Sequence, residues 1–198
     1  MADEKRPYRM KRRAELEEQT RRRITESTVV LHGTVGPART SISAIADRAG
    51  VRRSTVYRHF PDEATLFAAC SAHWSAANPP PDLERWAAIR APDERLHTAL
   101  GELYAHYRRT ELMMANLTRD AATVPIVGKL FGAGIGAYLG AAAETLMIGR
   151  RARGSARKRV RAAIGHALAF GTWQSLAREQ GLGDSDAVDL MCRLVQAA

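Results

Sequence analysis

The sequence predicts an all-α fold built from two helical sections, and three observations support this. Apolar residues recur at a spacing of three or four along almost the whole chain, which is typical of amphipathic helices. No stretch alternates apolar and polar residues over the length of a strand. The run NPPP at 78–81 interrupts the helical pattern, and we expect it to be a stiff, extended boundary between the two sections.

The composition is that of a folded, positively charged protein. The chain has 198 residues, of which 45% are hydrophobic and 26% charged, so it can bury a normal core. Its formal net charge is +9 and its isoelectric point about 10.2, which suits a polyanionic partner. Residues 1–60 hold fourteen Lys and Arg against seven Asp and Glu, and seven further cations lie within residues 150–161. The positive charge is therefore concentrated in two places.

Cysteine use and hydropathy favour a cytoplasmic protein without metal or cofactor. Cys70 and Cys192 lie far apart and outside any paired motif, so neither a disulfide framework nor a zinc site is expected. The first ten residues lack the apolar segment of a signal peptide. The apolar stretch 121–149 contains Lys129 and Glu144, which leave fourteen uncharged residues between them, short of the ~20 that a bilayer requires. We therefore expect a buried helix there and no membrane partner.

The N-terminal region predicts a charged arm and a first helix. We expect residues 1–13 to form a basic arm and residues 14–61 to form the first domain, with residues 62–198 as the second. The first helix should run from about Glu15 to Gly33. Its inner face should carry Ile24, Thr28 and Leu31, which follow the helical period.

A short second helix and a tight turn follow. Gly36-Pro37 ends the first helix, and the hydroxyl of Thr40 or Ser41 should cap the second. Gly50 stands where a helix C-terminus favours a left-handed residue, which only glycine adopts without strain. The expected inward positions of this helix are Ile42, Ile45, Ala46 and Ala49.

A third helix, from about residue 52 to 59, should turn two of its residues into the core and the others outward. Val56 and Phe60 are four apart and share the inner face, so Ser54 and Arg58 must point away from it. Pro61-Asp62 ends this helix, and Asp62 should cap a fourth that runs to about residue 77.

The C-terminal section predicts six further helices. The expected ranges are 82–89, 92–110, 112–121, 125–148, 155–180 and 184–196, with Pro92, Pro125 and Ser155 near three of the starts and Asp184 as the last cap. The second domain should thus be entirely helical.

The third helix has the chemistry of a DNA-reading element. Its exposed face is at once cationic, hydroxylic and aromatic, and such side chains can pair with guanine, touch a thymine methyl or reach phosphate oxygens. The tight turn at Ala49-Gly50-Val51 between two short helices is typical of a helix-turn-helix, whose second helix enters the major groove. The alternative is a solvated charged face on a small helical bundle.

These residues resemble the TetR-like bacterial transcriptional regulators. The resemblance rests on RRRITES at 21–27, TSISAIADRAGVRRSTVYRHF at 40–60 and PDEATLF at 61–67, and it covers residues 21–70. It implies a homodimer, base contacts from the third helix and an effector cavity among the C-terminal helices. Carried over by position, the DNA-binding residues are Thr40, Ser41, Arg52, Arg53, Ser54, Thr55, Tyr57, Arg58 and His59.

Three positions depart from the family pattern. Glu63 stands where a lysine usually meets a phosphate, so that contact should be lost. His32 stands where a phenylalanine usually packs the first helix against the others. Arg52 replaces the common small capping residue, which weakens the start of the third helix.

In the C-terminal section the resemblance implies residues for an effector site and a dimer interface. The expected effector-binding residues are Tyr104, Met114, Leu117, Phe131, Tyr138, Phe170 and Trp173, although such apolar stripes are more often ordinary core. The expected dimer residues lie on the last two helices and are Leu168, Thr172, Leu176, Val188, Met191 and Val195. Glycines at 128, 132, 136 and 140 share one helix face, which favours close packing of a neighbouring helix over room for a ligand.

Several alternatives stay open. The basic arm could track a minor groove or be a frayed tail. The cluster 150–161 could be a solvated loop and first helical turn, or it could bind an anion, contact nucleic acid a second time or line a charged effector entrance. No enzyme motif is present: the sequence lacks HExxH, GxSxG and the phosphate-binding GxxxxGK[ST]. We expect no enzyme, but a double-stranded DNA operator and a small hydrophobic effector as partners of a repressor. The rivals are a transcriptional activator and a nucleoid-type protein that binds DNA by charge alone.

Overall fold

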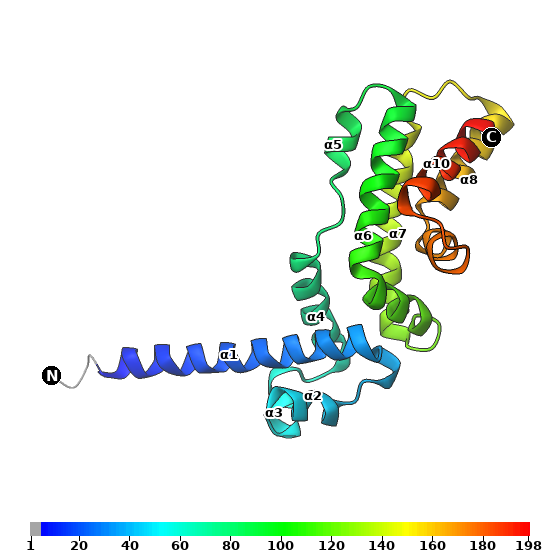
Figure 1. The fold of residues 1–198 in the computed structure, drawn as a ribbon. Helices are drawn as coiled ribbons and strands as arrows, with labels where there is room; N and C mark the ends of the chain where they lie inside the picture. The colour runs from blue at the N-terminus through cyan, green and yellow to red at the C-terminus, as the bar shows by residue number, and fades with distance from the viewer. Residues whose placement is uncertain (1–4) are drawn as a thin grey trace. The chain divides into compact units, whose positions relative to one another are not determined.

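The computed structural model describes residues 5–198, and every regular element in this range is a helix (Figure 1). The chain divides into two compact units. Unit 1 comprises Met1–Asn78 and Ala115–Leu130, and unit 2 comprises Pro79–Met114 and Phe131–Ala198. The first boundary falls inside the predicted proline-rich break. Residues 62–78 and 115–130, which we expected in the second domain, instead belong to unit 1.

Unit 1 is built on a small helical bundle. Its elements are α1 (Lys5–Thr34), the 3-10 helix η1 (Pro37–Arg39), α2 (Ile42–Ala49), α3 (Arg53–His59) and α4 (Glu63–Ala77). The core of the bundle contains Ile24, Ile45, Ala46, Ala49, Val56, Phe60 and Leu66, with Leu31 and Ile42 packed against it. The inward faces predicted for the first three helices are therefore confirmed.

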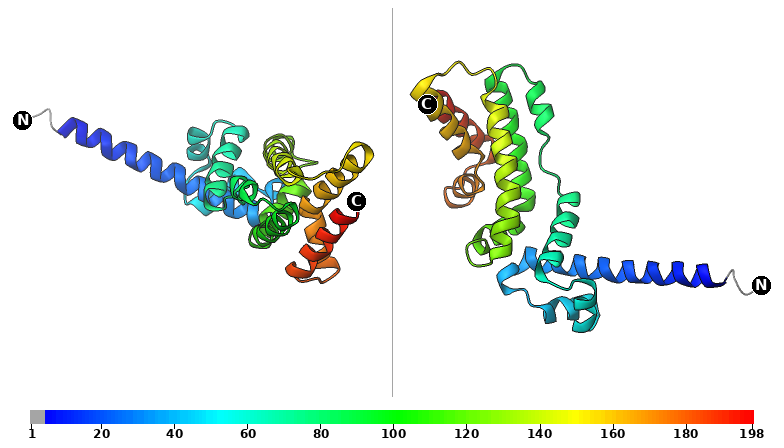
Figure 2. Two further views of the ribbon diagram at one scale, coloured as in Figure 1. Left: turned by 90° about the horizontal axis from the view of Figure 1, so that it is seen from above. Right: turned by 180° about the vertical axis from the view of Figure 1, so that it is seen from behind.

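Helix α1 is longer than the sequence predicted, because it begins at Lys5 rather than near Glu15. Both views in Figure 2 show it as one long helix whose N-terminal part extends beyond α2 and α3. Ion pairs at a spacing of four, such as Arg13–Glu17 at 3.2 Å, support helix in this exposed stretch. A helix is ~10–12 Å across and the minor groove only ~6 Å wide, so in this form residues 5–13 cannot follow that groove.

The ends of α2 and the start of α4 follow the expected capping chemistry. Ser41 is the cap of α2, and its Oγ accepts the N–H of Ala44 at 3.1 Å. Gly50 adopts the left-handed conformation with φ of 63°, which lets the N–H of Val51 reach Ala46 O at 3.0 Å. Asp62 caps α4, and α3 begins at Arg53 without a side-chain cap from Arg52.

His32 lies in the interior of unit 1 as a neutral side chain. It is 8% exposed, its ring centroid is 5.8 Å from that of Phe67, and its Nδ1 is 3.7 Å from Sγ of Cys70. Burial lowers the pKa of His32 to about 4, and the opposing attraction of Asp120 is the smaller effect. The histidine therefore packs where the family pattern has phenylalanine.

Unit 2 contains the other helices. They are α5 (Leu83–Ala88), α6 (Pro92–Asp120), α7 (Pro125–Met147), α8 (Gly154–Leu168), α9 (Phe170–Gln174), the π-helix η2 (Ser175–Glu179) and α10 (Asp184–Ala197), of which α6 and α7 also contribute residues to unit 1. The predicted helices at 92–110 and 112–121 form one continuous helix, so that division was wrong. The predicted helix at 155–180 is interrupted at Ala169, where ψ is 134°. Gly183, rather than Asp184, is the cap of α10.

Polar side chains satisfy the backbone carbonyls that these helix ends leave free. The hydroxyl groups of Tyr104 and Tyr107 donate to Ala167 O at 2.9 Å and Leu168 O at 2.7 Å, just before the break after α8. Arg95 is 2% exposed and donates to carbonyls near the ends of α5 and α7, including Ile148 O at 2.7 Å. Both arrangements satisfy acceptors that would be costly to leave unpaired.

Helix α7 is more exposed than we expected. By length and composition it could cross a membrane, but only 17% of its most apolar stretch is buried inside the chain. One helix of this kind is weak evidence for a membrane span, because helices of soluble proteins satisfy the same criteria. The prediction of a buried helix is therefore wrong for the chain by itself.

The glycine seam of α7 does not pack closely against a neighbouring helix of the same chain. A Cβ atom added at Gly132, Gly136 or Gly140 would meet no other atom within 4 Å. At Gly128 it would lie 2.7 Å from Ala121 O. Close packing thus explains Gly128 alone, and room for a ligand at the other glycines stays a prediction.

We expect Gly136→Ala to raise the free energy of unfolding by roughly 0.5–1 kcal/mol, because alanine favours an exposed helix and nothing obstructs its Cβ. Gly128→Ala is the matched control on the same helix and should lower it, since its Cβ would clash with a backbone oxygen. Urea unfolding of both variants measures the difference. A loss of stability in Gly136→Ala would mean that this face is occupied in solution.

His32 should make the protein less stable in mild acid. Its folded pKa lies below its unfolded value of about 6.5, so the folded state binds fewer protons. The stabilisation is complete above that value and is lost as the pH falls from 6.5 towards 4, by on the order of 3 kcal/mol. His32→Phe should remove this part of the pH dependence, whereas His73→Phe at an exposed position should not. Urea midpoints measured at several pH values between 7 and 4 test this, and equal slopes for wild type and His32→Phe would contradict it.

Candidate nucleic-acid interface

Helix α3 presents the face that the sequence predicted. Val56 is 0% and Phe60 2% exposed, so the opposite side of the helix faces solvent. Arg53, Ser54, Tyr57 and Arg58 are exposed, Thr55 and His59 are half-buried, and Arg52 is exposed just before the helix. Two guanidinium groups, a hydroxyl and a phenol thus share one accessible surface. Such a set can donate to guanine and to phosphate oxygens.

Arg21 of α1 holds the C-terminal end of α3. Its Nη1 donates to His59 O at 2.8 Å, and its guanidinium lies 4.3 Å from the ring centroid of Phe60. A cation at this place also complements the negative end of the helix dipole. The sequence reasoning did not single out Arg21, although its three-residue spacing from Ile24 puts it on the inner side of α1.

His59 combines a buried ring nitrogen with a positively charged setting. Its Nε2 is buried and has no hydrogen-bond partner in the described part of the chain. Burial lowers the pKa of His59, and the nearby cations Arg58 and Arg21 lower it further, while Glu17 and Glu18 oppose them. The imidazole is therefore neutral at pH 7 and can act as a donor or acceptor at the edge of α3.

Thr40 and Ser41 lie directly before α2, where the first helical N–H groups have no partner inside the helix. The hydroxyl of Thr40 donates to Gly36 O at 2.8 Å, and Ser41 is exposed. Hydroxyl groups and free backbone N–H groups at a helix start are typical phosphate ligands. Both donors of Thr40 are used within the chain, since its N–H donates to Pro37 O, whereas Ser41 is exposed at the helix start. A phosphate contact here stays a prediction.

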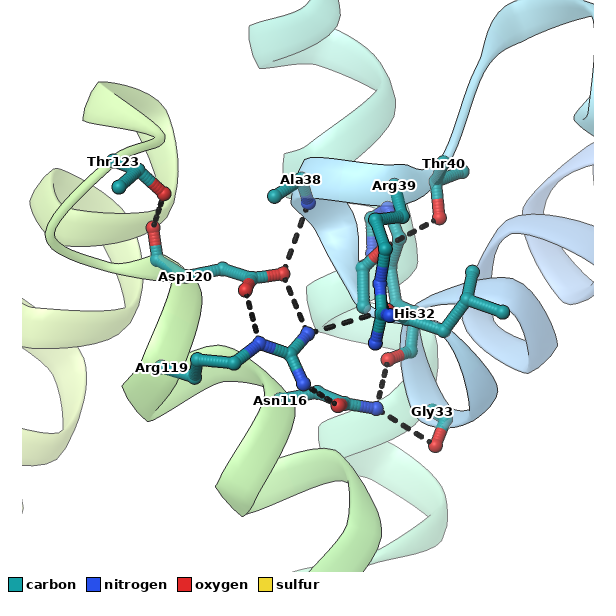
Figure 3. Close-up of polar contacts among 11 residues, drawn as sticks. His32, Gly33, Ala38, Arg39, Thr40, Asn116, Arg119, Asp120 and Thr123 are labelled. Atoms are coloured by element: carbon teal, nitrogen blue, oxygen red, sulfur yellow. Dashed lines mark hydrogen bonds and ion pairs between the residues drawn. The ribbon is translucent and has the colours of Figure 1, made fainter.

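A polar network from the end of α6 holds the connection between α1 and α2 (Figure 3). Asp120 is 3% exposed, and its Oδ2 accepts the N–H of Ala38 at 2.9 Å. Arg119 donates from Nε to Asp120 Oδ1 at 2.7 Å and from Nη1 to Asn116 Oδ1 at 2.7 Å. Nothing in the local sequence indicates the contact between Asp120 and Ala38, because 82 residues separate the two.

The start of α4 is acidic where the family pattern has a lysine. Glu63 is exposed, and Asp62 beside it accepts the N–H and the hydroxyl of Thr65, both at 2.7 Å. These hydrogen bonds lower the pKa of Asp62, so its carboxylate is charged at neutral pH. At position 63 this edge of unit 1 therefore presents a carboxylate to a phosphate, where a lysine would present a cation.

The residues predicted to bind an effector are mostly packed core. Tyr104, Phe170 and Trp173 form one aromatic cluster around Tyr107, which the sequence reasoning missed; Phe170 and Tyr107 have ring centroids 5.3 Å apart. Of the other predicted residues, Met114 and Leu117 are buried, Leu117 belongs to unit 1, and Phe131 and Tyr138 of α7 are half-buried. Among the described residues, no group of three or more His, Cys, Asp or Glu could hold a metal ion.

The residues predicted for the dimer interface already have partners within their own chain. Five of the six, Leu168, Thr172, Val188, Met191 and Val195, are at most 9% exposed, and Leu176 is half-buried. A dimer interface formed by these side chains stays a prediction. The large apolar residues that α10 leaves exposed are Leu190 and Leu194, at 40% and 42%.

An exposed cationic helix, placed after a tight glycine turn in a three-helix bundle, defines a helix-turn-helix DNA-binding protein. Residues 24–70 match the family model of the bacterial regulatory proteins of the tetR family. No curated protein matches the chain by sequence.

Solved structures with a similar fold cover almost the whole chain. One is a TetR-like transcriptional regulator from Rhodococcus sp. RHA1, with 19% identity, a TM-score of 0.65 and coverage of 89% of this chain and 93% of that one. A transcriptional regulator from Rhodococcus sp. Rha1 has 20% identity, a TM-score of 0.58 and coverage of 89% and 96%. A TetR transcription regulator from Haloarcula marismortui ATCC 43049 has 15% identity, a TM-score of 0.54 and coverage of 91% and 95%. Residues 24–70 thus match the helix-turn-helix region of the tetR family, and the chain has the fold of TetR-like regulators.

Substitutions on α3 should separate base contacts from phosphate contacts. Arg53→Ala and Thr55→Ala should each cost ~1–3 kcal/mol at particular base pairs, because the lost contacts read bases. Tyr57→Phe should weaken binding to all sequences alike, because its hydroxyl would meet a phosphate. Binding of each variant to a library of single-base operator variants measures both effects. An Arg53→Ala protein with full affinity and unchanged base preference would contradict the assignment of α3.

Proposed function

We propose that this protein is a transcriptional repressor that binds an operator as a homodimer and leaves it when a small hydrophobic effector binds. The observation that carries the proposal is the outer face of α3. Val56 and Phe60 are buried on the opposite face, so the outer face presents the side chains of Arg53, Ser54, Thr55 and Arg58. In a helix-turn-helix this face meets base edges in the major groove. The net charge of +9 supports attraction to DNA.

The dimer follows from the geometry of duplex DNA. Two copies of α3 would enter successive major grooves about one helical turn, ~34 Å, apart. The last helices would form the contact between the two copies, with Leu190 and Leu194 of α10 as its apolar centre, since the other large apolar residues of that helix are buried in their own chain. Burial of exposed leucines is a common driving force for such contacts.

The effector would bind in unit 2, near the aromatic cluster of Tyr104, Tyr107, Phe170 and Trp173. The break at Ala169 and the π-helix Ser175–Glu179 beside this cluster are irregular segments, which can rearrange at lower cost than continuous helix. An effector can change the spacing of the two α3 helices in the dimer only if it binds one arrangement of unit 2 more tightly than the other. The size of the change is limited by that difference in affinity.

Gel shifts with the DNA upstream of the protein's own gene test this function. We expect retention of a large ratio between the affinities for operator and random duplex at 150 mM salt, because a repressor reads bases. A panel of hydrophobic compounds should contain one that releases the operator. A ratio near one would favour the charge-driven binder, and binding that raises transcription in a reporter assay would favour an activator.

A further inference from the structure

We propose that Asn116, Arg119 and Asp120, in the last turns of α6, are positioning residues for the DNA-binding site. They would hold the connection between α1 and α2, including Thr40, so that the neighbouring Ser41 meets a DNA phosphate. This inference rests on the proposed function, because it assigns partners to residues of that same interface.

The connection has little else to hold it. The 3-10 helix η1, which links α1 to α2, buries none of its own residues, so apolar packing does not fix it. Its cap position is Gly36, which has no side chain to satisfy the first N–H groups. Asp120 takes that role from another part of the chain by accepting the N–H of Ala38 at 2.9 Å. The order of this segment thus depends on a carboxylate of α6.

The same three residues also grip the end of α1. The side-chain amide of Asn116 donates to His32 O and to Gly33 O, each at 3.0 Å. Arg119 donates from Nη2 to Val35 O at 3.2 Å and joins Asn116 to Asp120, as Figure 3 shows. These contacts span the chain from the last turn of α1 to η1.

Gly36 shows how closely the network fits the connection. Its φ of +91° favours glycine, and a Cβ there would clash with Nη2 of Arg119 and lie 2.5 Å from Oδ2 of Asp120. The hydroxyl of Thr40 donates to Gly36 O, and its N–H donates to Pro37 O at 3.0 Å. The network therefore fixes the position of Thr40 through Gly36 and Pro37, each of which accepts one hydrogen bond from Thr40.

The charges of the network are balanced in a way that suits DNA nearby. The carboxylate of Asp120 is paired with Arg119, and this pair, the Ala38 N–H and Arg39 together keep the pKa of Asp120 below its usual value in spite of burial. A charged Asp120 is thus neutralised and does not repel a phosphate. Loss of the carboxylate would free η1 without adding or removing a direct DNA contact.

The test compares Asp120→Ala with Asp120→Asn and with a matched control in unit 2. Arg85→Met removes an exposed ion pair within unit 2, in which Nη2 of Arg85 lies 3.6 Å from Oε1 of Glu102. All proteins are assayed well below their melting temperatures, by gel shift at several salt concentrations and by phosphate-ethylation interference. Ethylation interference reports individual phosphate contacts, which a general loss of stability does not remove.

We expect Asp120→Ala to lose roughly tenfold in affinity for operator and random duplex alike, because phosphate contacts carry no base information. The salt slope should be unchanged, since hydroxyl and N–H groups release no counterions. Interference should disappear at one phosphate per half-site, while Asp120→Asn, which keeps an acceptor for Ala38, should retain most of the affinity. Arg85→Met should bind like wild type.

Wild-type affinity and interference in Asp120→Ala would overturn the inference. An equal loss of affinity and interference in Arg85→Met, compared at equal thermal stability, would overturn it as well. If Asp120→Ala does not fold, Arg119→Met takes its place, because that variant keeps the hydrogen bond between Asp120 and Ala38. Loss of interference at the same phosphate then supports the inference, and unchanged interference overturns it. A wild-type protein that does not prefer its operator would instead refute the proposed function.

Discussion

The complete burial of Val56 is the constraint on which the DNA-binding surface depends. Val56 is packed with Ile24, Ile45 and Phe60 in the core of unit 1. It is the one buried residue among the seven of α3. Because that side is committed to the core, the rotation of α3 about its axis is set, and its polar side chains face outward. The packing of Val56 in the core therefore determines which side chains α3 exposes on its outer surface.

Arginine serves two different purposes in this molecule. Some arginines are exposed on α3, where they are available to a polyanion. Others donate to backbone carbonyls. Arg21 binds a carbonyl at the end of α3, Arg119 binds one just after α1, and Arg95 binds carbonyls near the ends of two helices of unit 2. Five guanidinium N–H groups in a planar fork suit such multiple acceptors. The net charge therefore overstates the number of cations that are free to meet DNA.

The features that the sequence predicted correctly are local ones. Val56 and Phe60 share a face by spacing alone, Gly50 stands at a position that requires positive φ, and Ser41 and Asp62 cap the helices that follow them. Such signals depend on neighbours within four residues, so they can be read without knowledge of the tertiary structure.

The features that the sequence could not predict depend on distant partners. Asp120 meets Ala38 across 82 residues, and no periodicity relates the two positions. The division of α6 into two helices was wrong because charged residues interrupt its apolar pattern without breaking the helix. The apolar stripe around Val188 was taken for an interface, although it is buried in its own chain. Periodicity identifies a buried face but does not name what buries it.

A footprint of the protein on its operator tests the central claim most directly. Hydroxyl-radical protection and methylation interference report which sugars and which major-groove guanine N7 atoms are covered. Two protected regions centred about one helical turn, ~34 Å, apart, each with interference at guanine N7, are the result that two inserted α3 helices predict. A single continuous protected stretch without interference in the major groove would contradict the account.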